Sequence, residues 1–468
     1  MREILALLPK PSRYLGIEEG AAEVDLSQTR LHTVLAFPDM YEVGMSYLGH
    51  KILYSLLNNH PEITAERVFT PCREAARILR EHGIPLATLE SDTPLAKTHL
   101  IGFSITTELC FTNLLYMLDL ADIPLRAEDR GDDLFAYPII MAGGGCTICA
   151  EPVAPFMDIM ALGEGEIMMP PLMELLIEAR RKKWTKTRFL EEASRISGIY
   201  VPRFFDLNAD GSLTPKLSGY TKIKRRAVAD LKDARYPDKQ VVPFGAVHNR
   251  LSLEIARGCT RGCRFCQAGM TLRPSRERNV EEIKGILDSC LAKTGFDDVS
   301  FLALSCGDFS MLKHLFLDSA EKCKKEQVSI SLPSLRVGSV DGDIMQAMAG
   351  IRRTGATLAP EAGSQRLRDV INKGVTEEAL IHHVRQLVGY GWQQVKLYFM
   401  IGLPTETYED LDAIVELCKK VRDCCRIPNE KGYIEGPRIA VTAALSPFVP
   451  KTHTPFQWEA QISLEEMK

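Results

Sequence analysis

The chain has 468 residues, of which 45% are hydrophobic and 7% aromatic, a composition typical of a globular protein with two or three domains. Its 57 lysines and arginines are balanced by 61 aspartates and glutamates, and the net charge of −4 excludes a strong overall field that attracts nucleic acid. No apolar run reaches the length of a membrane span, and residues 1–20 lack the apolar core of a signal peptide. Because thirteen scattered cysteines fit a reducing compartment, we expect a cytoplasmic protein without a membrane partner.

Short apolar runs predict four buried strands in the first 180 residues, at 33–37, 100–104, 139–141 and 159–162, with helical stretches between them. This alternation predicts a doubly wound, flavodoxin-like α/β domain over residues 1–180. Ligands of such sheets collect at the carboxyl ends of the strands. The polar residues and glycines that stand at these ends are Asp39, Tyr41, Gly44, Ser104, Thr106, Gly143, Gly144 and Glu164.

The same domain contains a Cys-x2-Cys pair, Cys146 and Cys149. Such pairs serve in redox exchange or in zinc sites. No second pair stands near enough in the sequence to complete a zinc site, which favours structural thiols at a strand end.

Residues 181–244 are expected to connect two domains, ending in an extended linker at 237–243. Two basic runs, 180–188 and 222–226, stand beside Trp184 and Tyr220, a combination that also occurs on RNA-binding surfaces. The acidic balance of the whole chain favours a solvated face instead.

From residue 245 the βα alternation resumes, with strands predicted at 251–256, 298–304, 328–332, 357–359, 395–401 and 439–443. Helical stretches such as 280–294 and 376–389 lie between them. Six βα units in about 200 residues fall short of a closed eight-fold barrel, which needs about 250. An open (β/α)6 partial barrel over residues 245–458 fits this length.

The loop after the first barrel strand carries Cys259, Cys263 and Cys266 with the spacing Cys-x3-Cys-x2-Cys. Three thiolates on one short loop can each bind one iron of a [4Fe-4S] cluster and leave the fourth iron open to chelation by an amine and a carboxylate. Gly258 and Gly262 allow the backbone to bend around the cluster. A zinc site would need a fourth ligand nearby, and neither His nor Cys follows within twenty residues of Cys266.

This spacing, with an aromatic residue before the last cysteine, resembles the radical S-adenosylmethionine (SAM) superfamily. The resemblance implies that SAM binds the open iron and is cleaved by one electron, delivered by a donor such as flavodoxin or ferredoxin, to give a 5′-deoxyadenosyl radical. It places SAM contacts at the strand ends of the partial barrel. The residues that it assigns to them are Phe265, Ser305, Gly307, Asp308, Glu361, Arg366, Gly402 and Leu403. Phe448, after the sixth strand, either flanks the adenine or packs in the core.

The N-terminal domain resembles the cobalamin-binding domain that precedes the radical SAM barrel in one large subclass, and the run Gly-Glu-Gly-Glu at 163–166 adds to this resemblance. The motif that supplies an axial cobalt ligand in such domains reads Asp-x-His-x-x-Gly. Here Tyr41 stands in the place of the histidine. Because a neutral phenol binds cobalt poorly, we expect base-off cobalamin without a histidine ligand. Tyr41 either approaches the lower cobalt face or packs on the next helix, and His32 and His50 are interpreted as structural.

Methylthiotransferases also resemble this chain, since their flavodoxin-like domain holds a second cluster on three cysteines. The corresponding candidates here are Cys72, Cys110 and Cys146, while the run at 163–166 and the Tyr-substituted motif favour cobalamin.

The favoured function is cobalamin-dependent methyl transfer to an unactivated carbon of a small-molecule or RNA substrate. The alternatives are a radical rearrangement, methylthiolation, and a sensor of cobalamin or redox state. A capping box at 463–466 begins a helix in residues 459–468, and the chain resembles an uncharacterised subfamily with an additional C-terminal region. We therefore expect this chain to stop early.

Overall fold

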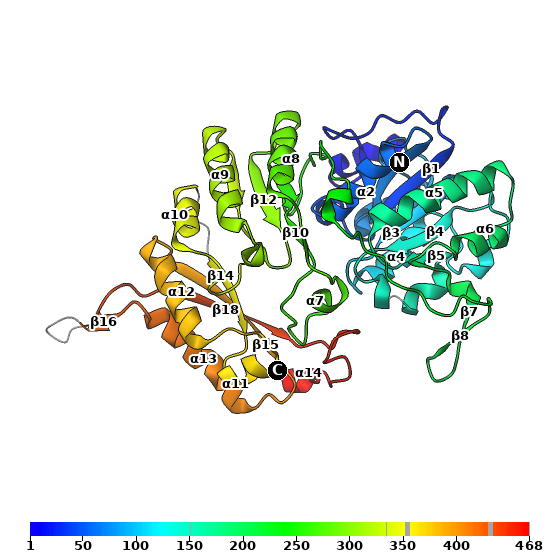
Figure 1. Cartoon of the computed structure of the whole chain (residues 1–468). Helices are drawn as coiled ribbons and strands as arrows, with labels where there is room; N and C mark the ends of the chain where they lie inside the picture. Colours follow the sequence, from blue (N-terminus) through cyan, green and yellow to red (C-terminus); the bar gives the residue numbers. More distant parts are fainter. Residues whose placement is uncertain (150, 334, 352–355, 429–433, 468) are drawn as a thin grey trace. The chain divides into compact units, whose positions relative to one another are not determined.

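The computed structural model describes the whole chain apart from residues 150, 334, 352–355, 429–433 and 468 (Figure 1). The chain divides into two compact units. The first comprises Met1–Asn249 with Asp288–Gly295, and the second comprises Arg250–Leu287 with Phe296–Lys468. Within the described residues, no helix combines the length and the apolar character that crossing a membrane requires.

The first unit is built on a six-stranded sheet with the order β2-β1-β3-β4-β5-β6. Its strands are β1 (Leu31–Phe37), β2 (Ile63–Phe69), β3 (Leu100–Ser104), β4 (Ile139–Gly143), β5 (Ile159–Ala161) and β6 (Ile199–Tyr200). The first five strands are parallel and β6 is antiparallel to β5. The parallel part has the flavodoxin-like order 2-1-3-4-5, so the predicted fold class is confirmed, and the order reverses between β1 and β3.

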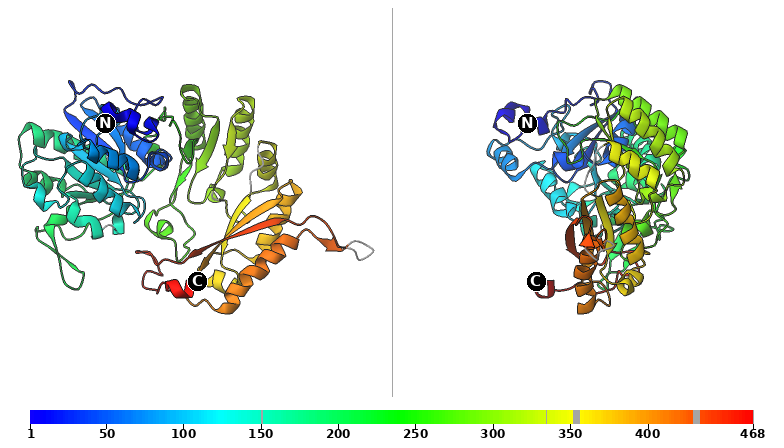
Figure 2. Two further views of the ribbon diagram at one scale, coloured as in Figure 1. Left: turned by 180° about the vertical axis from the view of Figure 1, so that it is seen from behind. Right: turned by 90° about the vertical axis from the view of Figure 1, so that its left-hand side faces the viewer.

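Helices cover both faces of this sheet (Figures 1 and 2). The helices are α1 (Tyr41–Gly44), α2 (Leu48–Asn58), α3 (Arg73–Glu81), α4 (Cys110–Leu120), α5 (Gly165–Arg181) and α6 (Lys186–Ala193). Alternate residues of β1 enter different apolar clusters: Val34 packs in the cluster that contains α3 and α4 side chains, and Leu35 in the one that contains α2, α5 and α6 side chains. The period-2 pattern of β1 is therefore buried on both sides, as a parallel strand requires.

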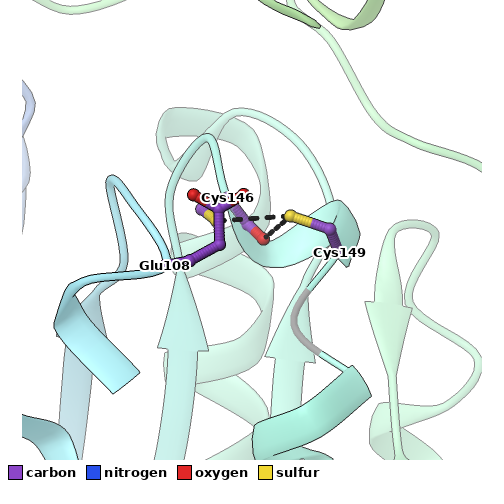
Figure 3. A group of neighbouring side chains, drawn as sticks. All are labelled: Glu108, Cys146 and Cys149. Carbon is purple, nitrogen blue, oxygen red and sulfur yellow. Dashed lines mark hydrogen bonds between the residues drawn. The ribbon is translucent and has the colours of Figure 1, made fainter. Parts of the chain in front are cut away.

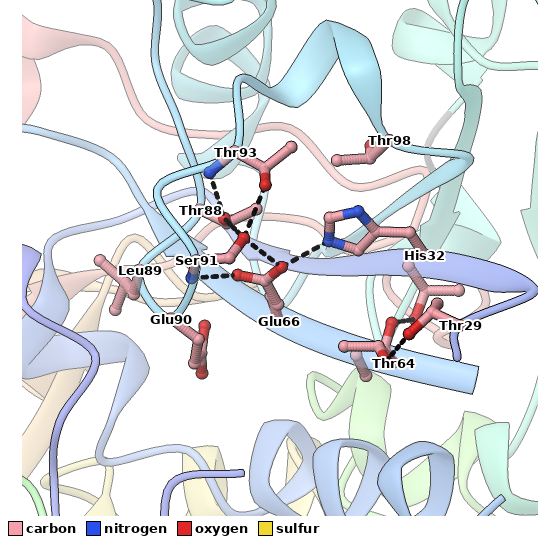
Figure 4. A network of polar contacts seen from close by, with 12 residues as sticks. Thr29, His32, Thr64, Glu66, Thr88, Leu89, Glu90, Ser91, Thr93 and Thr98 are labelled. Atoms are coloured by element: carbon pink, nitrogen blue, oxygen red, sulfur yellow. Dashed lines mark hydrogen bonds and ion pairs between the residues drawn. The ribbon is translucent and has the colours of Figure 1, made fainter. Parts of the chain in front are cut away.

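Strand β2 was not predicted, because Glu66 and Arg67 interrupt its apolar run. Both charges are buried and paired in the structure. Glu66 Oε1 lies 2.5 Å from His32 Nε2, and its carboxylate accepts hydrogen bonds from the backbone N–H and the hydroxyl of Ser91 (Figure 4). A buried carboxylate is tolerated only with such partners, and these come from β1 and from the segment between α3 and β3.

Arg67 is the centre of a second buried network. Its guanidinium lies 2.7 Å from the Glu18 carboxylate and 2.6 Å from that of Glu90. The hydroxyl of Tyr41 donates to Glu18 and that of Tyr54 to Glu90. Burial disfavours the charged guanidinium, but Glu90 and Glu18 hold the pKa of Arg67 well above its usual value. These contacts attach the N-terminal segment that carries Glu18 to β2.

The segment 181–244, which was expected to connect two domains, belongs to the first unit. It contains a hairpin of β7 (Phe205–Leu207) and β8 (Leu213–Pro215), and further on it returns to the end of β5. There the Arg226 carbonyl accepts from Glu164 N at 3.0 Å, and Val228 N donates to the Glu164 carboxylate at 2.8 Å. Gly163 has φ +144°, and a Cβ there would lie 2.0 Å from the Arg226 carbonyl oxygen, so only glycine fits.

The second unit contains the six predicted barrel strands: β9 (Leu251–Glu254), β12 (Asp298–Leu302), β13 (Ser329–Ser331), β14 (Ala356–Glu361), β15 (Gln394–Ile401) and β18 (Ala440–Pro447). They form two parallel groups, β13-β12-β9 and β14-β15-β18. The main helices are α8 (Val280–Lys293), of which the part from Asp288 is grouped with the first unit, α9 (Leu312–Lys325), α10 (Gly342–Ile351), α11 (Gln365–Val370), α12 (Glu377–Gly389) and α13 (Tyr408–Asp423). The α/β partial barrel of the prediction is thus confirmed as a fold class.

In β15, Val395, Leu397 and Phe399 are buried, whereas Lys396 and Tyr398 are exposed. This alternation leaves one face of β15 polar and accessible. Helix α13 begins with a capping box in which Thr407 and Asp410 satisfy each other's backbone N–H groups. That box fixes the loop between β15 and α13, which carries predicted site residues.

Candidate active site

The three-cysteine loop follows β9 and is closed at its base. Residues Ala256–Arg257 (β10) pair antiparallel with Arg276–Glu277 (β11). Gly258 has φ +90°, and a Cβ there would lie 2.5 Å from the carbonyl oxygen of Pro274. The backbone therefore turns tightly at the position where a glycine was expected to be needed.

Backbone N–H groups point at two of the three sulfurs. Cys259 Sγ accepts from Arg261 N at 3.5 Å, and Cys266 Sγ accepts from Gly269 N at 3.4 Å. Cys266 is also the N-cap of the short helix α7 (Gln267–Thr271), and all three cysteines are partly exposed thiols. Such donors stabilise thiolate charge and tune the potential of a cluster, so this loop fits a [4Fe-4S] cluster.

Two cations near the cysteine loop come from distant parts of the sequence and were not predicted. Burial raises the pKa of the Cys263 thiol, while the positive charges of Lys373 and Arg336 act in the opposite direction. Lys373 Nζ lies 5.9 Å from the centre of the Phe265 ring, and Arg336 donates to the Gly374 carbonyl at 2.7 Å. No local sequence pattern marks either residue, since the fold alone brings them to the loop.

The segment after α11 holds the cysteine loop in place through two hydrogen bonds. Asn372 Nδ2 donates to the Gly262 carbonyl at 2.9 Å, and Arg264 N donates to the Ile371 carbonyl at 3.0 Å. Lys373 follows in the same segment, so its position is tied to that of the cysteines.

Asp308, in the loop that follows β12, contacts the cysteine loop directly. Arg261 Nε donates to its carboxylate at 2.6 Å, and this hydrogen bond holds the pKa of Asp308 below its usual value. Ser305 is the N-cap of the 3-10 turn Cys306–Asp308. Gly307 lies against Ser339, whose Oγ would be 2.0 Å from an added Cβ. The three predicted residues of this turn therefore lie together, close to the cysteine loop.

Glu361 ends β14 in the left-handed region, with φ +70°. The pairing register between β14 and β15 shifts at this point. For a residue other than glycine this conformation costs about 1–3 kcal/mol, and such strain is concentrated at functional sites. Lys373 Nζ lies 3.0 Å from the Glu361 carboxylate, so the predicted site residue and the unpredicted cation form an ion pair.

The remaining barrel residues of the prediction have internal partners. Arg366 forms an ion pair with Asp410 and donates to the Thr405 carbonyl at 2.8 Å. Gly402, with φ +75°, donates its N–H to the Glu406 carboxylate. Leu403 is buried in a small apolar cluster that also contains Phe448, which packs edge-on against Phe456. Phe448 thus has a packing role in this structure.

In the first unit, the loops after β3 and β4 are joined to each other. Ile105 N donates to the Gly143 carbonyl at 2.7 Å, and Gly144, with φ +111°, lies against the Ile105 backbone. A Cβ added at Gly143 would meet no atom within 4 Å. Ser104 and Thr106 lie in the β3 part of this edge, and Asp39 follows β1. An open glycine turn beside the β1/β3 reversal suits the close approach of a large cofactor.

Three other predicted residues of this unit are held by internal contacts. Tyr41 is only 3% exposed; its ring packs edge-on against Phe69 and its hydroxyl donates to Glu18. Gly44 lies against Phe69, and the Glu164 carboxylate is held by the segment 225–228. Tyr41 therefore has a packing and hydrogen-bonding role in this structure.

His32 and His50, the two histidines nearest to Tyr41 in the sequence, are also buried. His32 pairs with Glu66, and His50 is 1% exposed between the rings of Phe37 and Phe69. Burial lowers the pKa of His50 to about 3. Neither ring nitrogen of His50 has a hydrogen-bond partner among the described residues.

Two protein-family models match the chain. "Radical SAM proteins, N-terminal" matches residues 49–202, and "Radical SAM superfamily" matches residues 253–418. The match in the second unit confirms the radical SAM resemblance of the barrel, and the first unit matches the N-terminal domain of radical SAM proteins. A radical SAM domain implies SAM and a [4Fe-4S] cluster as cofactors, and the matched range contains Cys259, Cys263 and Cys266.

Among curated proteins, the chain is 30% identical over 325 residues to an uncharacterised protein of Methanocaldococcus jannaschii, with 69% of this chain and 62% of the relative covered. It is 24% identical over 327 residues to an uncharacterised methyltransferase of Pyrococcus horikoshii, with 69% and 64% covered. The chain thus spans less than two thirds of these relatives' length.

Among solved structures, the chain is similar to the radical SAM methyltransferase TsrM of Kitasatospora setae, whose structure contains cobalamin and a [4Fe-4S] cluster. The TM-score is 0.59 at 13% identity, over 92% of this chain and 74% of that one. At this identity the likeness establishes a shared fold.

Proposed function

We propose that this protein is a radical SAM enzyme that cleaves SAM reductively at a [4Fe-4S] cluster on Cys259, Cys263 and Cys266 and uses cobalamin to methylate an unactivated carbon. The observation that carries the proposal is the loop itself: three thiols at a strand end, with backbone N–H groups directed at two of the sulfurs. When bound, the cluster and SAM supply the radical chemistry and cobalamin supplies the methyl transfer.

The chain's own residues have separate tasks in this proposal. Gly258 and the pairing of β10 with β11 shape the loop, and the segment that contains Asn372 holds it in place. Lys373 and Arg336 would bind the carboxylate of SAM, and Glu361 would accept hydrogen bonds from its ammonium group or ribose. Because Lys373 already pairs with Glu361, SAM binding would replace one ion pair by two charge-assisted contacts.

For cobalamin, the first unit offers the edge formed by Asp39, Ser104, Thr106, Gly143 and Gly144. Ligands of flavodoxin-like sheets bind where the strand order reverses, and the reversal between β1 and β3 supports this assignment. The open position beside Gly143 fits close backbone approach by the cofactor. The cobalamin in the TsrM structure supports this assignment by similarity of fold.

The test is anaerobic reconstitution with iron and sulfide, followed by dithionite, SAM and hydroxocobalamin. We expect 5′-deoxyadenosine from the parent protein and none from Cys263→Ala. With methyl-labelled SAM, label in the product of a cell-extract substrate supports methyl transfer. Production of 5′-deoxyadenosine that is unchanged in Cys263→Ala would refute the cluster assignment, while SAM cleavage without transferred label would count against methyl transfer.

Methylthiolation is the second candidate, because Cys72, Cys110 and Cys146 follow β2, β3 and β4, three parallel strands of one sheet. A small-molecule or RNA substrate that gains sulfur, together with a second cluster lost in Cys110→Ala, would favour it. The electron would come from a small donor protein such as flavodoxin or ferredoxin in either case.

A further inference from the structure

Three potential metal ligands meet at the carboxyl edge of the first unit's sheet. Glu108 follows β3, and Cys146 and Cys149 follow β4. One ligand atom of each residue lies within 4.8 Å of the other two, and no other group of this kind occurs in the part of the chain that the structure describes (Figure 3). The sequence marks Cys146 and Cys149 as a pair but gives no sign that Glu108 joins them.

The backbone holds the two thiols side by side. Cys146 N donates to the Ile105 carbonyl at 3.1 Å, which ties the pair to the loop that carries Glu108. The 3-10 turn Thr147–Cys149 then brings the two sulfurs to 3.3 Å, and Cys149 Sγ donates to the Cys146 carbonyl at 3.1 Å. Thr147 fixes this turn through hydrogen bonds to the Gly144 and Ala161 carbonyls.

We infer that Cys146, Cys149 and Glu108 form a site for a zinc-class divalent cation, with two thiolates and one carboxylate as ligands and the fourth position open. Tetrahedral Zn²⁺ with its usual bond lengths places ligand atoms about 3.3 to 3.8 Å apart. The observed sulfur separation is 3.3 Å, so the sulfurs need to move apart by only about 0.5 Å. A disulfide would require them to approach by more than twice as much, to about 2.05 Å.

The charges and the accessibility of the three residues agree with an open site. The divalent ion compensates two of the three negative charges of the two thiolates and the carboxylate, and solvent screens the third because Glu108 is exposed. Cys146 is buried, whereas Cys149 is only partly buried and Glu108 reaches solvent. Sites with three protein ligands and an accessible fourth position are those that bind water or a substrate atom.

The site contains none of the residues assigned to the cluster or to cobalamin, although it lies at the same edge of the sheet as the cobalamin residues. It uses none of the cysteines of the barrel loop, and it shares only Cys146 with the set Cys72, Cys110 and Cys146. Because Cys149 and Glu108 belong to this site alone, their variants separate it from a cluster on the other three cysteines.

The experiment uses the full chain in the background Cys259→Ala, Cys263→Ala, Cys266→Ala, so that the barrel loop contributes no thiolate. One equivalent of Co²⁺ is added to reduced protein under anaerobic conditions. We expect a thiolate-to-cobalt charge-transfer band and the visible bands of four-coordinate cobalt, both abolished by one equivalent of Zn²⁺. Zn²⁺ binding should release about two protons, which a pH indicator in weak buffer reports.

Two substitutions test the ligands and one serves as the matched control. Cys149→Ala should abolish the charge-transfer band, and Glu108→Gln should weaken Zn²⁺ by at least about 10-fold, since even outer-shell partners of a metal contribute 10- to 100-fold. Cys110→Ala, a neighbouring cysteine outside the site, should leave binding unchanged. Thermal melting of each apoprotein shows whether it is folded.

Three results would overturn the inference: no cobalt band in the background protein, a band that survives Cys149→Ala, or a band that is lost in Cys110→Ala. A Cys146–Cys149 disulfide, found by peptide mass spectrometry in protein isolated anaerobically, would do the same.

Discussion

Arg261, in the middle of the cysteine loop, donates to Asp308 at the end of the β12 loop, at 2.6 Å from Nε to the carboxylate. The pair links the loop to the strand end where SAM contacts are predicted. Since Arg261 is substantially exposed, the pair contributes only about 0–1 kcal/mol to stability. The role of the Arg261–Asp308 pair is to fix the position of the cysteine loop.

The first prediction follows from this pair. Asp308→Asn should leave the melting temperature and the iron content close to those of the parent, and should lower the rate of 5′-deoxyadenosine formation by about 10- to 100-fold, since misplacement of reacting groups by about 1 Å has effects of that size. Iron analysis and single-turnover kinetics measure the two quantities. An equal loss of iron and of rate would show instead that the pair is needed to assemble the cluster.

A second prediction concerns Gly258. In Gly258→Ala, the new Cβ would meet the Pro274 carbonyl and the backbone would be held at a φ that side chains disfavour. We expect iron content after reconstitution to fall at least fivefold. Gly285→Ala is the matched control, because Gly285 lies in helix α8 with no atom within 4 Å of the added Cβ, and this change should be neutral or stabilise by up to about 1 kcal/mol.

The third prediction is electrostatic. Lys373 places a positive charge near Cys263, and a cation stabilises the more negative, reduced form of a cluster. Lys373→Met should therefore lower the reduction potential by roughly 50 mV, which is about a tenfold change for one electron, and should weaken SAM binding. Redox titration followed by electron paramagnetic resonance gives the potential. A potential unchanged in Lys373→Met would contradict the assigned role.

A fourth prediction uses the buried His50. Its pKa in the folded protein is about 3, against about 6.5 when unfolded, so between these values the unfolded chain binds more protons. Stability should thus be complete above pH 7 and decline as the pH falls below about 6.5, with His50 contributing about 1–2 kcal/mol of the loss between pH 7 and pH 5. His50→Leu should reduce this loss, and it also removes two buried nitrogens that have no hydrogen-bond partner among the described residues. Urea denaturation of both proteins at the two pH values is the measurement, and an equally steep decline in His50→Leu would count against it.

The fifth prediction is the cobalt environment. The Tyr41 hydroxyl donates a hydrogen bond to Glu18, and the side chains of His32 and His50 are buried in the first unit. Cobalamin bound to the reconstituted protein should therefore be base-off and without a histidine ligand, and Tyr41→Phe should leave its spectrum unchanged. Electron paramagnetic resonance of the cobalt(II) form detects an axial nitrogen by its superhyperfine splitting. Seeing that splitting, or failing to retain cobalamin at all, would decide against this assignment.

The sequence was sufficient for features that depend on local pattern. The six barrel strands and the parallel strands β1, β3, β4 and β5 are apolar runs, and the cysteine spacing is local by nature. Strand β2 was missed because Glu66 and Arg67 are buried by partners that lie up to 49 residues away, and no pattern within the strand reports them. Lys373, Arg336 and Glu108 were missed for the same reason, since each joins its site only through the fold.

The return of residues 225–228 to Gly163 and Glu164 means that the first unit needs chain well beyond its last parallel strand. A protein cut after residue 180 would keep every strand from β1 to β5, but it would lose Arg225 and Val228, which donate hydrogen bonds to the buried Glu164 carboxylate. In chimaeras between relatives, the stretch up to residue 228 therefore has to be inherited together with the sheet, although it contributes none of the sheet's parallel strands.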